Sequence, residues 1–320
     1  MLLRTLSLIL TGLLLTTSPT RAEDRSPTQD AAEVLRQIES APPRGLFYEA
    51  HKDGKTFYLF GTLHVGQPDF FPLEKRVVQA IAQSSALAVE IDISKSEAMQ
   101  AAVMRYALLP TGTSLDSLLP PELRARMQAQ LTTLGLPPEA VQPFKPWMAA
   151  LTITLTAIQK SGYDGNYSSD GFLIGLAQGL SKPVLELESI DQQLGLFDAI
   201  SPPRQIQFLD ESLKPLESGE LAGDTRKLVD AWLFSDAAGL EALARKHQQA
   251  SPDWSDWLQQ KLYVERNVNM VAQIEKMLAQ GHIPFVAVGT LHLVGSDSIP
   301  ALLQQRGYRI LPLYPSRPAP

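Results

Sequence analysis

A four-residue motif, Gly-Thr-Leu-His, occurs twice in this chain, at 61–64 and again at 289–292. Each copy follows an apolar run that begins with Phe and is long enough for a buried strand of a parallel sheet. The glycine allows the backbone to turn or to approach another group closely. His64 and His292 are therefore expected just beyond the carboxyl ends of two strands, which is where open α/β sheets bind their ligands.

The first 22 residues have the pattern of a cleaved secretory signal peptide. Arg4 precedes a short apolar run, and the small residues Thr20 and Ala22 mark a cleavage site. The run is too short to span a bilayer comfortably, so we expect no stable membrane insertion after cleavage; an uncleaved anchor is the alternative. The chain has no cysteine, which excludes disulfides and thiolate metal sites. Together these features predict a bacterial protein that is periplasmic or secreted.

The charge of the chain bears on its partners. The full sequence has a formal net charge of −6, and loss of residues 1–22 removes two arginines and no acid, which leaves −8. An acidic chain disfavours nucleic acid and anionic membranes as partners. Because no linker or low-complexity tract divides the rest, we expect a lead-in segment over 23–44 and a single domain over 45–320.

The order of predicted elements indicates an α/β fold (α+β by some schemes). A strand pair joined by an Asp-Gly turn is followed by a helix and a second buried strand, which forms a βαβ unit with parallel strands. This unit brings Glu90 to the sheet edge that holds His64. A later strand ends in two acids, of which we favour Glu188 over Glu186 for the strand end. The remainder predicts a mostly parallel central sheet with flanking helices and a large helical insertion over about 95–180 and 202–280. Besides the strand before the second Gly-Thr-Leu-His motif, the predicted strands lie at 46–51, 56–60, 87–92, 182–188 and 308–313. The predicted helices lie at 31–38, 74–83, 96–109, 121–134, 146–160, 169–180, 224–234, 237–249, 254–280 and 299–306.

Four strand ends therefore place His64, Glu90, Glu188 and His292 along one edge. Two imidazoles with one or two carboxylates suit Zn²⁺, Mn²⁺, Co²⁺ or Fe²⁺, and such an ion can turn bound water into a hydroxide nucleophile. The sequence has neither a His-Glu-x-x-His helix nor a Gly-x-Ser-x-Gly elbow, which counts against the common zinc-protease and serine-hydrolase templates. Packed core histidines are the alternative interpretation.

Several further motifs accompany the two Gly-x-x-His motifs along the chain. They are the acid-ended strand 88–92, Lys145-Pro146-Trp147, the segment 170–198, Glu265-Arg266-Asn267-x-x-Met270 and Arg306-Gly307-Tyr308. With these motifs the chain resembles the TraB/PrgY/GumN family, whose animal members include the Tiki proteins, over about residues 45–315. The resemblance implies a compact α/β fold similar to erythromycin esterases and ChaN-like proteins. Tiki members are regarded as metal-dependent proteases that use both Gly-x-x-His motifs and a glutamate.

From the residues and the resemblance together we predict an exported metal-dependent hydrolase, specifically a peptidase, with His64, Glu90 and His292 as ligands of Mn²⁺, Co²⁺ or Zn²⁺. Glu188 or Asp170 would act as the base, and Arg266 would stabilise the developing negative charge. The structural alternatives are that Glu188 orients a histidine, that Asp170 caps a helix and that Arg266 pairs with a structural acid.

Two other functions stay open at this point. One is the non-catalytic capture of a peptide or a haem-like ligand in the same cleft, and the other is an esterase that acts on a small molecule. The sequence does not determine the substrate or the oligomeric state.

Overall fold

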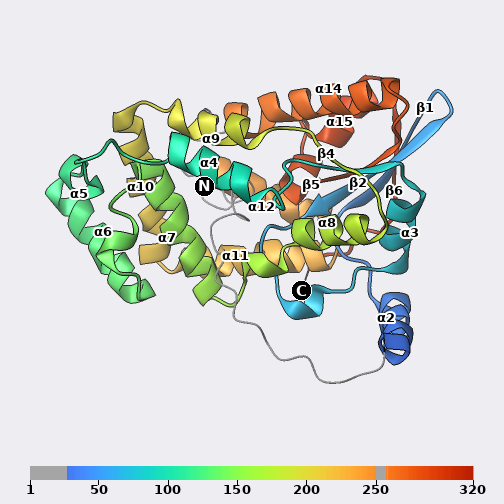
Figure 1. Cartoon of the computed structure of the whole chain (residues 1–320), viewed down its shortest axis with the longest axis horizontal. Coiled ribbons are helices and arrows are strands. Elements are labelled where there is room, and N and C mark those ends of the chain that lie inside the picture. Colours follow the sequence, from blue (N-terminus) through green and yellow to red (C-terminus); the bar gives the residue numbers. More distant parts are fainter. Residues whose placement is uncertain (1–26, 250–256, 258, 320) are drawn as a thin grey trace.

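A computed structural model describes residues 27–249, 257 and 259–319 (Figure 1). The predicted signal peptide lies outside the described residues. So do residues 254–256 and 258 of the predicted 254–280 helix.

The centre of the fold is a six-stranded sheet with the strand order β4-β3-β5-β2-β1-β6. Strands β4, β3, β5 and β2 run parallel, and β1 pairs antiparallel with both β2 and β6. The predicted α/β class with a mostly parallel sheet is thus confirmed. The strands are β1 (Phe47–Lys52), β2 (Lys55–Thr62), β3 (Ala86–Val89), β4 (Val184–Glu186), β5 (Pro284–Gly289) and β6 (Arg309–Pro312).

Both faces of the central strands are covered, which explains their continuous apolar sequences. Every residue of β3 and β5 is buried. Helices α3 (Lys75–Gln83) and α8 (Ser169–Gly179) lie on one face of the sheet, and α14 (Glu265–Ala279) and α15 (Ile299–Gln305) lie on the other (Figure 1).

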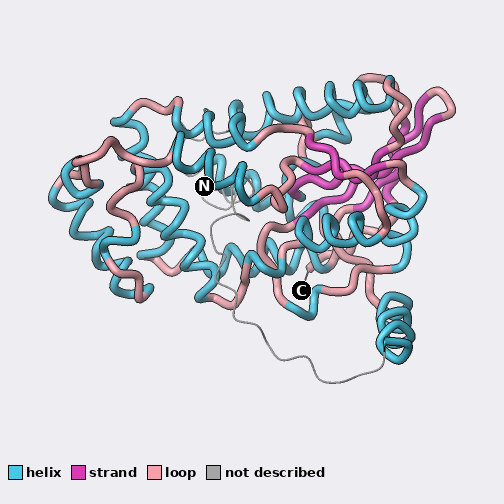
Figure 2. The backbone as a smooth tube through the Cα atoms, viewed as in Figure 1, coloured by secondary structure: helices cyan, strands magenta, loops and turns pink. Residues whose placement is uncertain are grey.

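Except for α2 (Pro27–Ser40), which lies on the same side of the molecule as the strands in Figure 1, the remaining helices extend the molecule away from the sheet, and Figure 2 shows the strands gathered towards one end. Helices α6, α7 and α10 contact one another at the far end, and α7 is largely buried between its neighbours. No helix within the described ranges is both long and apolar enough to cross a membrane. The helices away from the two sheet faces are α2 (Pro27–Ser40), α4 (Ser96–Tyr106), α5 (Leu115–Leu118), α6 (Pro121–Leu134), α7 (Pro146–Lys160), α9 (Ile190–Asp198), α10 (Pro202–Glu217), α11 (Glu220–Leu233) and α12 (Ala237–Gln249).

Three predicted elements differ from the structure near the sheet edge. Strand β3 ends at Val89 and β4 at Glu186, so both are shorter than predicted, yet the chain continues alongside: the Glu188 amide donates to the Glu90 carbonyl at 2.9 Å. The predicted long helix contains a π-helical turn, Gln260–Val264, before α14 begins. Such turns widen a helix locally, and this one immediately precedes Arg266.

Candidate functional site

Two glutamates from neighbouring strands lie side by side at the carboxyl edge of the sheet. Glu90 follows β3 and Glu188 follows β4, and both are more than nine-tenths buried. A buried carboxylate is costly unless it is paired. The partner of both is Arg266, which enters from α14 on one face of the sheet.

The guanidinium of Arg266 holds the two carboxylates together. Its Nε donates to both oxygens of Glu188 at 2.9 Å, and its Nη2 lies 2.5 Å from Glu188 Oε2 and 2.6 Å from Glu90 Oε2. Burial lowers the pKa of a guanidinium, but the charges of Glu188 and Glu90 outweigh it and raise the pKa of Arg266. Two carboxylates share one cation, so the cluster keeps one negative charge in excess.

His292 turns an unprotonated ring nitrogen, Nε2, towards the guanidinium of this cluster. Asn267 donates its Nδ2 to the Asp297 carbonyl at 2.7 Å, so its Oδ1 must accept from His292 Nδ1, 2.5 Å away. The lone pair of His292 Nε2 then faces Arg266 Nη1 at 3.2 Å and Glu90 Oε1 at 3.7 Å. Burial lowers the pKa of His292 to about 3, so the imidazole is neutral near neutral pH.

Glu90 stays ionised despite its burial. Burial alone would raise its pKa, but the charges of His292, Arg266 and His64 and the amide of Gly289, which donates to Oε1 at 2.6 Å, lower the pKa of Glu90 to about 2. Because His292 is neutral near pH 7, the positive charge of Arg266 is what keeps Glu90 ionised at that pH.

The first Gly-Thr-Leu-His motif is built in a parallel way. His64 Nδ1 donates to Asp170 Oδ2 at 2.8 Å, and the hydroxyl of Thr62 donates to Asp170 Oδ1 at 2.8 Å. Ser168, rather than Asp170, caps the start of α8. Each histidine is therefore oriented through Nδ1 by an oxygen acceptor, Asp170 in one copy and Asn267 in the other, which is the usual support of a metal-binding imidazole.

Comparison with known proteins gives a clear family assignment. The sequence profile of the TraB/PrgY/gumN family matches residues 46–312. The chain belongs to this family.

Several relatives are similar over most of the chain. The "uncharacterized protein YbaP" of Escherichia coli (strain K12) is 26% identical over 249 residues, which cover 78% of this chain and 88% of the relative. The "metalloprotease TIKI homolog" of Nematostella vectensis is 21% identical over 351 residues, which cover 94% of this chain and 71% of the relative. The "metalloprotease TIKI1" of Danio rerio is 21% identical over 338 residues, which cover 91% and 65%. No solved structure gives a significant match.

The predicted residues fall into two groups in this TraB/PrgY/gumN chain. Glu90, Glu188, Arg266 and His292 are in direct contact through the guanidinium, whereas His64 is hydrogen-bonded to Asp170. Across the described ranges, no three His, Asp or Glu side chains converge as they would around an ion. The guanidinium lies where the predicted ligands Glu90 and His292 approach each other.

Gln193 and Asn267 also contact the cluster, although neither is among the predicted site residues. A signal for Asn267 was available. Arg266 and Asn267 are one helical turn before Met270 and Val271, so two polar residues lie on the apolar face of α14. Polar side chains on a buried face indicate polar partners across the interface.

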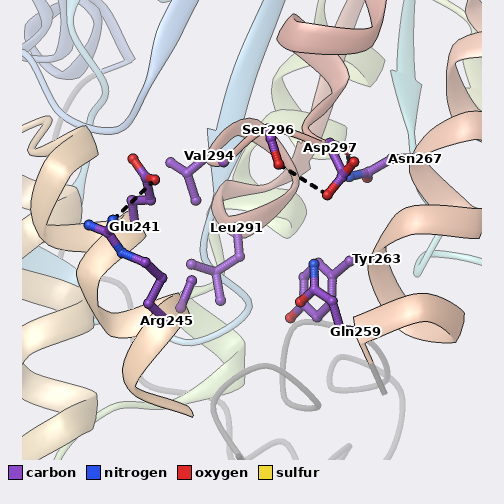
Figure 3. A pocket seen from close by; sticks show the side chains of 11 residues that line it. Glu241, Arg245, Gln259, Tyr263, Asn267, Leu291, Val294, Ser296 and Asp297 are labelled. Carbon is purple, nitrogen blue, oxygen red and sulfur yellow. Dashed lines mark hydrogen bonds and ion pairs between the residues drawn. The ribbon is translucent and has the colours of Figure 1, made fainter. Parts of the chain in front are cut away.

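A cavity of about 270 Å³ lies beside the cluster. Tyr263, whose ring centre is 5.1 Å from that of His292, and Asn267 form part of its wall, and Glu241 and Arg245 line it from α12 (Figure 3). His292 itself is fully buried. Tyr263 and Asn267 thus link the cavity to the cluster through their contacts with His292.

Proposed function

We propose that this chain is an exported metal-dependent hydrolase whose substrates are peptides. The observation that carries the proposal is the charge of the buried cluster: two glutamates share a single guanidinium, and the lone pair of a neutral imidazole accepts from the same guanidinium. An excess negative charge next to an unprotonated imidazole nitrogen suits a divalent cation.

The residues suit such an ion in donor type. His64, Glu90 and His292 would hold it: both histidines are hydrogen-bonded through Nδ1, and His292 Nε2 would exchange its hydrogen bond from Arg266 Nη1 for the ion. Two donors at a bond length of ~2.1 Å can be at most ~4.2 Å apart on one ion. Glu90 Oε1 and His292 Nε2, at 3.7 Å, meet this condition. Arg266 would keep its bond to Glu90 Oε2 while Oε1 turns to the ion.

A bound ion would supply a water of lowered pKa and polarise the bond to be cleaved. The protein groups have separate tasks around it. Asp170, which accepts a hydrogen bond from His64 Nδ1, would act as the general base. Glu188 is the alternative base, although both of its oxygens accept from Arg266. Arg266 would stabilise negative charge that develops on the substrate.

Peptides are proposed as substrates because two relatives that cover most of this chain carry the name metalloprotease. Export is proposed from the sequence of residues 1–22, which supports a cleaved signal peptide and a periplasmic location.

The test combines metal content with turnover. The wild-type chain, His64→Ala and His292→Ala are purified and analysed for bound metal, then incubated with a peptide library and Mn²⁺, Co²⁺ or Zn²⁺ while mass spectrometry detects cleavage. Both variants should lose metal and activity, whereas His282→Ala, at a partly buried histidine in the turn before β5, should keep both.

Unchanged turnover in either site variant would refute the proposal. Peptides that bind the metal-loaded wild type and stay intact after long incubation would instead favour sequestration, and cleavage of small esters alone would favour an esterase.

A further inference from the structure

Gln193 contacts both buried carboxylates, yet the proposed chemistry assigns it no part. It lies near the start of α9, where Ser189 and Gln192 form a capping box directly after Glu188. Its side chain is buried, with 1% of the residue exposed. Its Nε2 lies 3.1 Å from Glu188 Oε2 and 3.4 Å from Glu90 Oε2, whereas its Oε1 has no hydrogen-bond partner among the described residues.

The unpartnered oxygen Oε1 indicates which end of the Gln193 amide matters to the site. A buried amide oxygen without a partner destabilises the folded chain. A methionine would fill the same space without that cost. The part of Gln193 that contacts other polar groups is therefore the amide nitrogen, which is directed at the same two oxygens that share Arg266 Nη2.

We propose that Gln193 is a positioning residue of the site, which keeps Glu90 and Glu188 together without neutralising them. Two like charges repel, and a single guanidinium serves both. A second cation at position 193 would hold the carboxylates equally well but would cancel the excess negative charge. An amide supplies a donor and no charge. This inference rests on the proposed function, because the excess charge serves to bind a divalent cation.

The test measures divalent-metal affinity by isothermal titration calorimetry with Zn²⁺, Mn²⁺ and Co²⁺ alone, on the purified chain. Gln193→Met removes the bridging nitrogen at nearly constant size, and we expect a 10–100-fold loss of affinity, as is typical for groups that orient metal ligands. Gln193→Lys pairs the carboxylates but cancels the charge, so it should fold and bind metal more weakly than Gln193→Met.

The matched control is Gln205→Met. Gln205 is also buried, and its Nε2 donates to the Ile200 carbonyl at 2.8 Å, outside the cluster. This variant should lose thermal stability and keep the wild-type metal affinity. If Gln193→Met loses only thermal stability and binds metal within about twofold of the wild type, Gln193 is merely structural and the proposal is overturned.

Two further outcomes separate this inference from the proposed function. If Gln193→Met does not fold, Gln193→Lys decides: metal affinity equal to the wild type overturns the proposal, and a loss supports it. If the wild type binds none of the three metals, the proposed function fails, and crystal structures of the wild type and Gln193→Met decide on Gln193. Carboxylates of Glu90 and Glu188 that keep their separation overturn its positioning role, and carboxylates that move apart support it.

Discussion

Removal of the Arg266 guanidinium should be among the most destabilising single changes in this site. The side chains of Arg266, Glu90 and Glu188 are 3%, 4% and 7% exposed. Arg266→Met leaves two buried carboxylates without a counter-ion, and loss of one partner of a buried ion pair costs about 3–5 kcal/mol. For a domain of this size the midpoint of thermal unfolding should fall by roughly 10 °C.

The assay is thermal and urea unfolding of Arg266→Met, Glu188→Gln and the double variant. The double variant should be more stable than Arg266→Met, because one of the two uncompensated charges has been removed. The deficit of Arg266→Met should also shrink as the pH falls, because loss of the guanidinium removes one of the charges that lower the pKa of Glu90. Repulsion between Glu90 and Glu188 drives both effects.

The control is Arg126→Met. Arg126 forms ion pairs with Asp210 and Glu217 on the surface, where its side chain is 30% exposed. Exposed pairs contribute about 0–1 kcal/mol. If Arg266→Met costs no more than Arg126→Met, the buried cluster is not held by charge and the reasoning is refuted.

Two further predictions concern pH and packing. Burial lowers the pKa of His292 from 6.5 to about 3, so between these values the unfolded chain binds a proton that the folded chain does not, and stability should fall as the pH drops below 6.5. Thermal midpoints measured from about pH 7.5 to about pH 4.5 should fall less steeply for His292→Gln than for the wild type, and parallel curves would contradict this. Gly61→Ala should destabilise by about 1–3 kcal/mol, because its Cβ would lie 2.7 Å from Thr290 Oγ1 and 3.1 Å from Thr290 Cα. Gly175→Ala, in α8 with no atom within 4 Å of its Cβ, should stabilise by about 0.5–1 kcal/mol; urea unfolding measures both, and equal signs would count against the packing described.

Much of the fold could be predicted from the sequence because its signals are local. Apolar runs that stop at a glycine or an acid locate strand ends, and Asp53 and Gly54, both with positive φ, form the predicted tight turn between β1 and β2. The boundaries of α6 and α7 agree with the prediction, since proline marks both starts. The strand lengths of β3 and β4 agree less well, because hydrogen-bond pairing, rather than composition, decides where a strand ends.

The site could be predicted only in part. The repeated Gly-Thr-Leu-His motif and the acid-ended strands were enough to select His64, His292, Glu90 and Glu188, because parallel strands deliver their ends to one edge. The polar partners of these four side chains could not be predicted from strand ends. Arg266 is separated from Glu90 by 176 residues and meets it only because α14 covers the sheet face above it.

The sequence by itself thus determined which side chains reach the sheet edge, since strand periodicity and termination are properties of a few adjacent residues. Only the tertiary structure decided how they are charged and oriented: Asp170 and Asn267 fix the two imidazoles, and Arg266 and Gln193 fix the two carboxylates. The physical reason is that the state of a buried ionisable group depends on its nearest polar neighbours. In this chain those neighbours come from helices α8, α9 and α14, and the fold brings Arg266 of α14 to a carboxylate 176 residues away in the sequence.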